Sequence, residues 1–183
     1  MTYERLMGTT LLPDRLLFEG SVYDLQWDGR RHLPGESSFD PNILPTQDFA
    51  VYLINSVKFH CGRLFYLFEE EYFMKQFALF HEDPLEHARK YPLWYVHYLI
   101  VLAFGKAFVV QTSKSQRPPG TELFIQAMKL MPDLTFLEAD HIEKVQVLCC
   151  AALYLQCLNC RAAAHRYVSL LDLLTRLSLI WFL

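Results

Sequence analysis

One segment constrains the fold of this chain more than any other, a run from Pro92 to about Val110 that is apolar at nearly every position. A surface helix keeps a polar face, whereas a helix that is apolar on all sides has to be surrounded by other elements. We therefore expect a central, buried helix with the rest of the domain packed around it. The uncharged part, Pro92–Gly105, is shorter than the roughly 18–20 residues needed to cross a bilayer, so we expect no membrane partner.

The segments on either side of this run also have helical periodicity. We expect helices over residues 46–62, 69–79, 84–90, 121–131 and 140–158, and a last one from 160 or 161 towards the C-terminus. Two starts have the form of a capping box, Asp83-Pro84-Leu85-Glu86 and Asp140-His141-Ile142-Glu143. Asn159 is a plausible left-handed stop. The predicted fold class is all-α, an irregular bundle of six or seven helices.

Residues 1–45 differ from the rest because proline or glycine interrupts them every few positions. Within them, residues 22–27 alternate well enough for a short strand, but no partner strand is evident. We expect this part to be an extended N-terminal segment that lies on the helical domain.

Composition and charge exclude two classes of protein. Hydrophobic residues make up 52% of the chain and aromatic residues 15%, which favours a packed core over a disordered regulator. The net charge is -3, the sequence pI is about 6.1, and lysines and arginines are scattered. A domain that binds DNA directly usually has a basic face, so we expect no direct DNA contact by this chain.

The cysteines could suggest a metal site, since four of the five lie in one apolar segment: Cys61, Cys149, Cys150, Cys157 and Cys160. A tetrahedral zinc site favours paired ligands on turns, whereas Cys150 and Cys157 are two helical turns apart among leucine, alanine and valine. We interpret the cysteines as small core residues. Their odd number also indicates a reducing compartment and no disulfide framework.

Two polar clusters could carry chemistry. His81-Glu82-Asp83 with Glu86-His87 could hold a divalent metal, but the spacing is not that of a metalloprotease motif, and we interpret it as a solvated loop and helix start. His60, Cys61 and Arg63 could supply a nucleophile only through tertiary contacts. No phosphate-binding glycine loop is present. We therefore expect no catalytic, cofactor-binding or metal-ligating residue, no cofactor in this chain, and no enzymatic activity.

Aromatic side chains concentrate in two places, Phe65-Tyr66-Leu67-Phe68 and Tyr72-Phe73. Such runs are usually core, and the alternative is that they line a ligand pocket. Base stacking is not expected because no basic residues are interleaved with them.

The order of these segments resembles the regulatory (middle homology) region of fungal zinc-cluster transcription factors. Leu44-Pro45 and the helix after it are similar to the entry to that region, and Trp94–Phe108 is similar to its central helix. Later similarities are Ile142-Glu143-Lys144-Val145-Gln146-Val147-Leu148 and the Ala-x-x-Tyr-Val pattern within residues 161–168. The resemblance covers about residues 44–168.

We expect three parts: the extended segment 1–45, a partial regulatory domain 46–168, which the resemblance implies, and a divergent apolar C-terminal helix 169–183. In the family the zinc-cluster DNA-binding module lies N-terminal to this region, so zinc and DNA contact are implied only for that module. The family's Gly-x-Ala-x-Arg-x-Ala helix is replaced here by Ser169-Leu170-Leu171-Asp172. We therefore expect a domain cut at both ends that exposes apolar surface and self-associates.

The function implied by the resemblance is transcription regulation in a nuclear, fungal protein. The domain would act by binding a protein partner or a small effector and not by catalysis. The alternative is a helical adaptor or scaffold, with Pro92–Val168 read as two helix pairs that present a groove to peptides.

Overall fold

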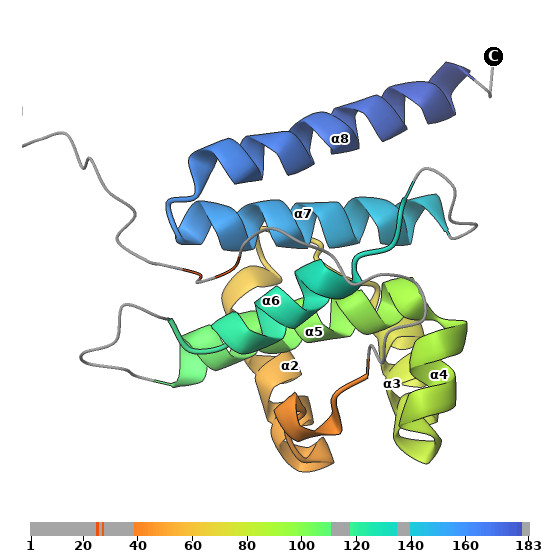
Figure 1. Ribbon diagram of the computed structural model, residues 1–183, viewed down its shortest axis with the longest axis vertical. Helices are drawn as coiled ribbons and strands as arrows, with labels where there is room; N and C mark the ends of the chain where they lie inside the picture. Colours follow the sequence, from red (N-terminus) through yellow and green to blue (C-terminus); the bar gives the residue numbers. More distant parts are fainter. Residues whose placement is uncertain (1–24, 26, 28–38, 111–117, 135–139, 181–183) are drawn as a thin grey trace, which may run out of the picture.

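The computed structural model describes residues 25, 27, 39–110, 118–134 and 140–180, with side chains as far as 173. The described residues form helices and no strands, which confirms the all-α prediction. In chain order the elements are a 3₁₀ turn η2 (Pro41–Ile43), α2 (Gln47–Cys61), α3 (Glu70–Glu82), α4 (Pro84–Lys90), α5 (Pro92–Val109), α6 (Thr121–Leu130), α7 (His141–Cys157) and α8 (Arg161–Ile180) (Figure 1).

Several helices begin or end at the capping residues that were predicted from the sequence. The Asp83 carboxylate accepts a hydrogen bond from the Glu86 amide at 3.0 Å, with Pro84 at the first helical position. Asp140 caps α7 in the same way through the Ile142 amide at 3.1 Å. Asn159 has a φ of 60°, so the left-handed stop between α7 and α8 is confirmed.

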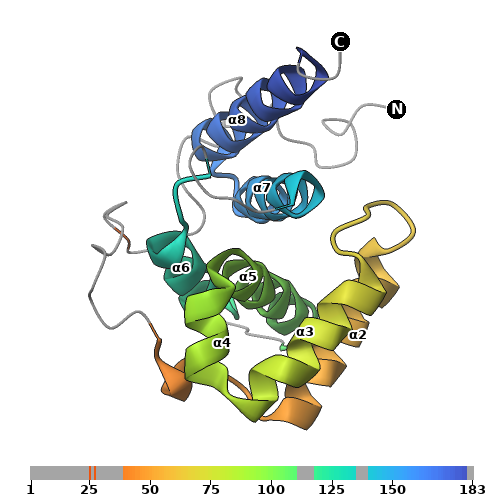
Figure 2. The same ribbon diagram turned by 90° about the vertical axis from the view of Figure 1, so that its right-hand side faces the viewer.

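Helix α5 is the centre of the fold, as its all-round apolarity predicts. It packs against α2, α6 and α7, and its residues from Leu93 to Gly105 are buried. A close helix crossing explains the glycine at 105, because an added Cβ there would lie 2.6 Å from both the Cβ and the carbonyl oxygen of Leu53. The arrangement places α2 and α6 beside α5 and leaves α7 to cover it from above (Figures 1 and 2).

The expectation that the central segment is too short to cross a membrane needs correction. Helix α5 has 18 residues and, among the described residues, is the one helix long and apolar enough to cross a membrane by length and composition. However, 72% of it is buried inside the fold, which is also the pattern of a core helix in a soluble protein. The difference arises because Lys106 and the residues after it extend the helix beyond the uncharged stretch.

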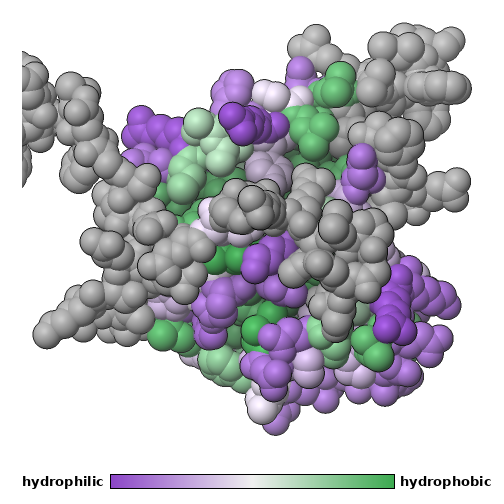
Figure 3. Space-filling model, in the orientation of Figure 1, coloured by the Kyte–Doolittle hydropathy of each residue, from purple (hydrophilic) through white to green (hydrophobic). Residues whose placement is uncertain are grey.

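Helix α8 forms an outer layer that packs on α7 (Figure 2). Ala164 faces the core and is 4% exposed, whereas Val168 and Leu173 are each 53% exposed. Leu173 belongs to the apolar C-terminal helix predicted over 169–183, and it is exposed because no further element covers this face among the described residues. In Figure 3, hydrophobic side chains are accordingly visible among hydrophilic ones where α7 and α8 lie in Figure 1.

Two predicted features lie largely outside the described residues. The short strand at 22–27 is described only at Leu25 and Trp27, which have no regular secondary structure and pack against the core. The polar loop before α6 is described only from Pro118 onward.

Candidate functional site

The candidate site is an apolar groove of about 690 Å³ between the segment after α2 and the helices α7 and α8. We call it the groove throughout. Its described lining residues are Leu64, Phe65, Tyr66, Leu67, Cys149, Ala152, Leu153, Gln156, Arg161, Ala164, His165, Val168 and Leu171. Its volume falls in the range of ~300–1,000 Å³ that is typical of small-molecule sites.

The wall formed by residues 64–66 is held in place by the residues that follow it. Leu67 and Phe68 insert into the core, while Leu64 and Tyr66 remain 79% and 71% exposed. The Leu67 carbonyl accepts a hydrogen bond from His97 Nε2 at 2.9 Å. The Cys150 thiol also donates to this carbonyl, at a sulfur–oxygen distance of 3.6 Å. Helices α5 and α7 therefore fix this wall through one backbone atom.

The same two side chains form a Cys–His pair that the sequence did not indicate. His97 Nε2 and Cys150 Sγ are 3.7 Å apart, and both residues are buried. Burial lowers the pKa of His97 to about 4, although its bond to the Leu67 carbonyl opposes the shift, and burial raises the pKa of Cys150. The thiol and the imidazole are thus neutral and away from solvent, so the pair anchors the wall and does not supply a nucleophile.

The sequence had instead suggested His60, Cys61 and Arg63 as neighbours. His60 and Arg63 are exposed, and the His60 ring lies 4.8 Å from the Phe108 ring centroid. Burial raises the pKa of the Cys61 thiol, which is the direction opposite to that of a reactive cysteine. No periodicity could have linked positions 97 and 150, because their contact depends on how α5 crosses α7.

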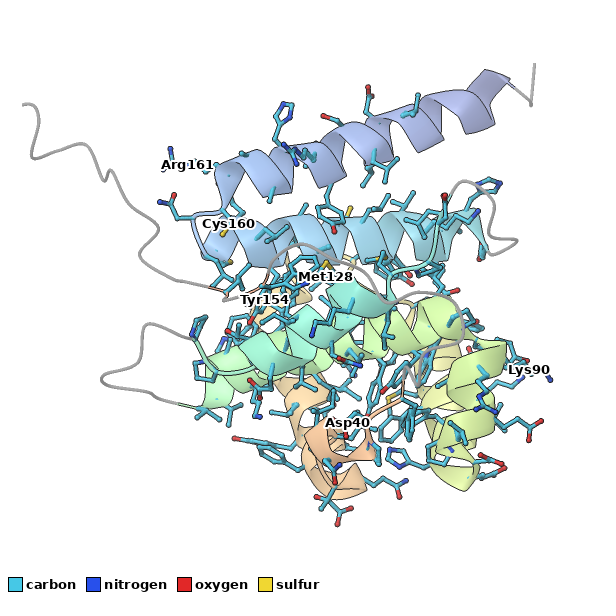
Figure 4. The ribbon with its side chains drawn as sticks, in the orientation of Figure 1. Asp40, Lys90, Met128, Tyr154, Cys160 and Arg161 are labelled. Carbon is cyan, nitrogen blue, oxygen red and sulfur yellow. The ribbon has the colours of Figure 1, made fainter. Side chains whose placement is uncertain are left out.

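The cationic and imidazole side chains of the groove, Arg161 and His165, both come from α8, and Gln156 of α7 and Tyr66 add neutral polar groups. Arg161 begins α8 beside Cys160, and its Nε donates to Asn159 Oδ1 at 2.9 Å (Figure 4). One turn on, His165 Nδ1 is 3.3 Å from Ser169 Oγ. None of the described lining residues is acidic. The groove is therefore an apolar channel with a permanent positive charge at one end.

Comparison of the chain with protein-family models, with curated proteins and with solved structures found no match. The assignment of a function therefore depends on the groove and on the residues around it.

The prediction that the cysteines are small core residues is correct for some of them. Cys150 is fully buried, Cys61, Cys149 and Cys160 are partly buried, and Cys157 is exposed, so the prediction is wrong for Cys157. The reason is position, since Cys157 is the last residue of α7. Among the described residues, no group of three His, Cys, Asp or Glu side chains could hold a metal ion.

The aromatic runs at 65–68 and 72–73 were predicted to be core or, alternatively, to line a ligand pocket, and the structure shows both. Phe68 and Phe73 belong to the core, Phe65 and Tyr66 line the groove, and Leu67 does both. The run at 65–68 has both roles because it crosses the surface and turns Leu67 and Phe68 inward.

The cluster at 81–87 is solvated only in part. Glu82, Asp83 and Glu86 are exposed, as predicted. His87 is 7% exposed, and its Nε2 lies 2.7 Å from Gln76 Oε1, so the solvated interpretation is wrong for this residue. The His87 ring on α4 packs against Phe80 of α3 and Trp94 of α5, with ring centroids 5.9 Å and 4.9 Å away, and these side chains cover it.

Proposed function

We propose that this chain is a regulatory domain of the zinc-cluster transcription-factor kind, and that its groove binds an apolar effector with a single acidic group. The domain acts by binding and not by catalysis. DNA contact belongs to a separate zinc-cluster module, and the setting is nuclear and fungal.

The observation that carries the proposal is the combination of an apolar lining with one cationic end. Leu153, Val168 and Leu171 offer apolar contact along the groove, and Arg161 offers a permanent charge at the start of α8. A charge-assisted hydrogen bond to a carboxylate adds orientation to otherwise non-directional apolar binding. The lack of acidic groups among the described lining residues removes a repulsive contact with such a ligand.

The regulatory role is supported by the ordered series of segments described above and by the all-α fold that carries them. The described helices share a single hydrophobic core centred on α5, which favours a closed domain over a stacked array of helix pairs. A helical adaptor that holds a peptide in the groove remains the alternative function.

Binding can be tested with the apolar aromatic anion 1-anilinonaphthalene-8-sulfonate, followed by its fluorescence. We expect saturable binding, which Val168→Asp weakens at least tenfold by placing a negative charge in the groove. Leu173→Asp is the matched control, because Leu173 is on the same helix and equally exposed but outside the groove. Equal loss in both variants would show that the dye reports only general apolar surface.

Regulation can be tested in a yeast reporter assay with the chain placed between a DNA-binding module and an activation segment. We expect decanoate to change reporter output in the wild-type fusion and not in the Val168→Asp fusion. A peptide library that selects helical peptides sensitive to Val168→Asp, together with no response to decanoate, would favour the adaptor instead.

A further inference from the structure

The groove presents apolar side chains at the surface of the described domain. Val168 is 53% exposed and Tyr66 is 71% exposed, and the half-buried Leu153 and Leu171 line the same surface. An apolar surface of this kind usually marks a binding site in a soluble protein. A stretch of the chain's own N-terminal sequence has the chemistry that this surface favours.

This stretch consists of residues 11–19, Leu-Leu-Pro-Asp-Arg-Leu-Leu-Phe-Glu, and we call it the leucine segment. It belongs to the part of the chain that is expected to be extended, and side chains alternate between the two sides of an extended chain. In that geometry one side carries Leu12, Asp14, Leu16 and Phe18. Arg15 falls on the opposite side. One side of the leucine segment is therefore apolar with a single carboxylate, which matches the ligand chemistry of the groove.

Charge complementarity favours the same pairing. With two carboxylates and one guanidinium, the leucine segment has a formal charge of -1. The groove has Arg161 at the start of α8 and no acidic side chain among its described lining residues. A guanidinium has five N–H donors, and the bond from Arg161 Nε to Asn159 uses one of them. A carboxylate on the apolar side of the leucine segment, that of Asp14, can therefore make a charge-assisted contact with Arg161.

The chain between the leucine segment and the domain is long enough for this contact. Leu25 and Trp27 pack against the core, so the chain is held on the domain 11 residues after Asp14. Those residues span up to about 36 Å when extended, at about 3.3 Å each. Helix α8, with 20 residues, is about 30 Å long. A tether of this length also keeps the local concentration of the segment high at the surface of its own domain.

We propose that the leucine segment docks in the groove of its own chain and competes there with the effector. Asp14 pairs with Arg161, while Leu16 and Phe18 pack on Val168 and Leu171. An effector that fills the groove displaces the segment, so binding changes the surface that α7 and α8 present to partners. The competition rests on the proposed function of the groove, whereas the docking of the segment does not.

Docking is tested in the full chain with the photoreactive residue p-benzoylphenylalanine in place of Phe18, followed by irradiation and mass spectrometry. We expect crosslinks within one chain to groove-lining residues of α7 or α8, and their loss when Val168→Asp is added. Leu173→Asp is the matched control and should keep them, because Leu173 is equally exposed and lies outside the groove. Crosslinks elsewhere in the chain, crosslinks between two chains, or crosslinks unchanged by Val168→Asp overturn the proposal.

Competition is tested by titrating decanoate into the wild type and into the double variant Leu16→Ser with Phe18→Ser. A ligand's apparent affinity falls with the fraction of molecules that are competent to bind it, so we expect the variant to bind at least threefold more tightly. The control is Leu6→Ser with Met7→Ser, which removes apolar side chains outside the leucine segment and should leave the affinity unchanged.

The two experiments separate this inference from the proposed function. Equal decanoate affinity in the wild type and the Leu16→Ser, Phe18→Ser variant overturns the competition, while the groove keeps its proposed ligand. Failure of both proteins to bind decanoate counts against the proposed function instead. The crosslinks from position 18 then decide by themselves whether the leucine segment docks.

Discussion

At the scale of single residues, the fold depends on a few positions where atoms approach closely in the core. Gly105 lets α5 cross α2 against Leu53, and His97 with Cys150 holds the Leu67 carbonyl beneath the groove. Neither feature follows from sequence periodicity, because each depends on which helices cross. The sequence could indicate that α5 is central, but not which of its residues would meet Leu53 or Leu67.

Replacing Gly105 by alanine should destabilise the protein. Alanine favours a helix by about 1 kcal/mol over glycine, but overpacking costs about 1–3 kcal/mol, and here the added Cβ meets backbone as well as side chain. Because the Leu53 backbone cannot move aside easily, we expect the overpacking cost to lie near the upper end of this range, which leaves a net loss of about 2 kcal/mol in urea unfolding. Ala107→Ser, at an exposed position of the same helix, should change stability by less than about 0.5 kcal/mol. A Gly105→Ala protein as stable as wild type would contradict the close crossing.

Stability should depend on pH through His97. Its pKa is lowered from 6.5 to about 4 in the fold, so between these values the unfolded chain binds more protons than the native one. This contribution is complete above pH 6.5 and is lost as the pH falls to about 4. The loss amounts to about 3 kcal/mol, with 1.36 kcal/mol for each pKa unit.

The measurement is the free energy of unfolding from pH 4 to 8 for the wild type and for His97→Gln. We expect the wild-type curve to fall more steeply below pH 6.5 than the variant curve, even if the variant is less stable throughout. Parallel curves would mean that His97 is not buried in its neutral form.

At the scale of helices, most ends are determined by local chemistry. Asp83 with Pro84 and Asp140 before His141 start α4 and α7, and Asn159 ends the turn before α8. These positions could be predicted because capping acts within a few residues. Burial of α8 could not be predicted in the same way, because an apolar pattern does not reveal whether another element covers it. Leu173 shows this, being apolar and still 53% exposed.

Removing the cap of α4 should have a measurable cost. Asp83→Ala deletes the acceptor of the Glu86 amide, and loss of such a cap typically costs about 1 kcal/mol. Asp48→Ala is the control, because Asp48 lies in the first turn of α2 and is not its N-cap, so only a dipole interaction of about 0.3–1 kcal/mol is lost. Equal losses in urea unfolding would argue against a specific cap at Asp83.

At the scale of the whole molecule, α5 and its neighbours form the core while α7 and α8 build the groove over it (Figures 1 and 2). The aromatic run at 65–68 indicated from sequence that a pocket was one alternative. The other wall could not be predicted, since Arg161 and Val168 reach it only through the turn at Asn159. The groove therefore combines the segment before α3 with α7 and α8.

Binding of an apolar acid in the groove is tested most directly by a methyl NMR titration of the full chain with decanoate and with decan-1-ol. We expect shifts centred on the methyl groups of Ala152, Leu153, Val168 and Leu171. Decanoate should bind about tenfold more tightly than the alcohol, and Arg161→Gln should remove that difference, because a charge-assisted hydrogen bond is worth about 1.5–3 kcal/mol. Shifts spread over other surfaces, or equal binding of acid and alcohol by the wild type, would contradict a groove that recognises apolar acids.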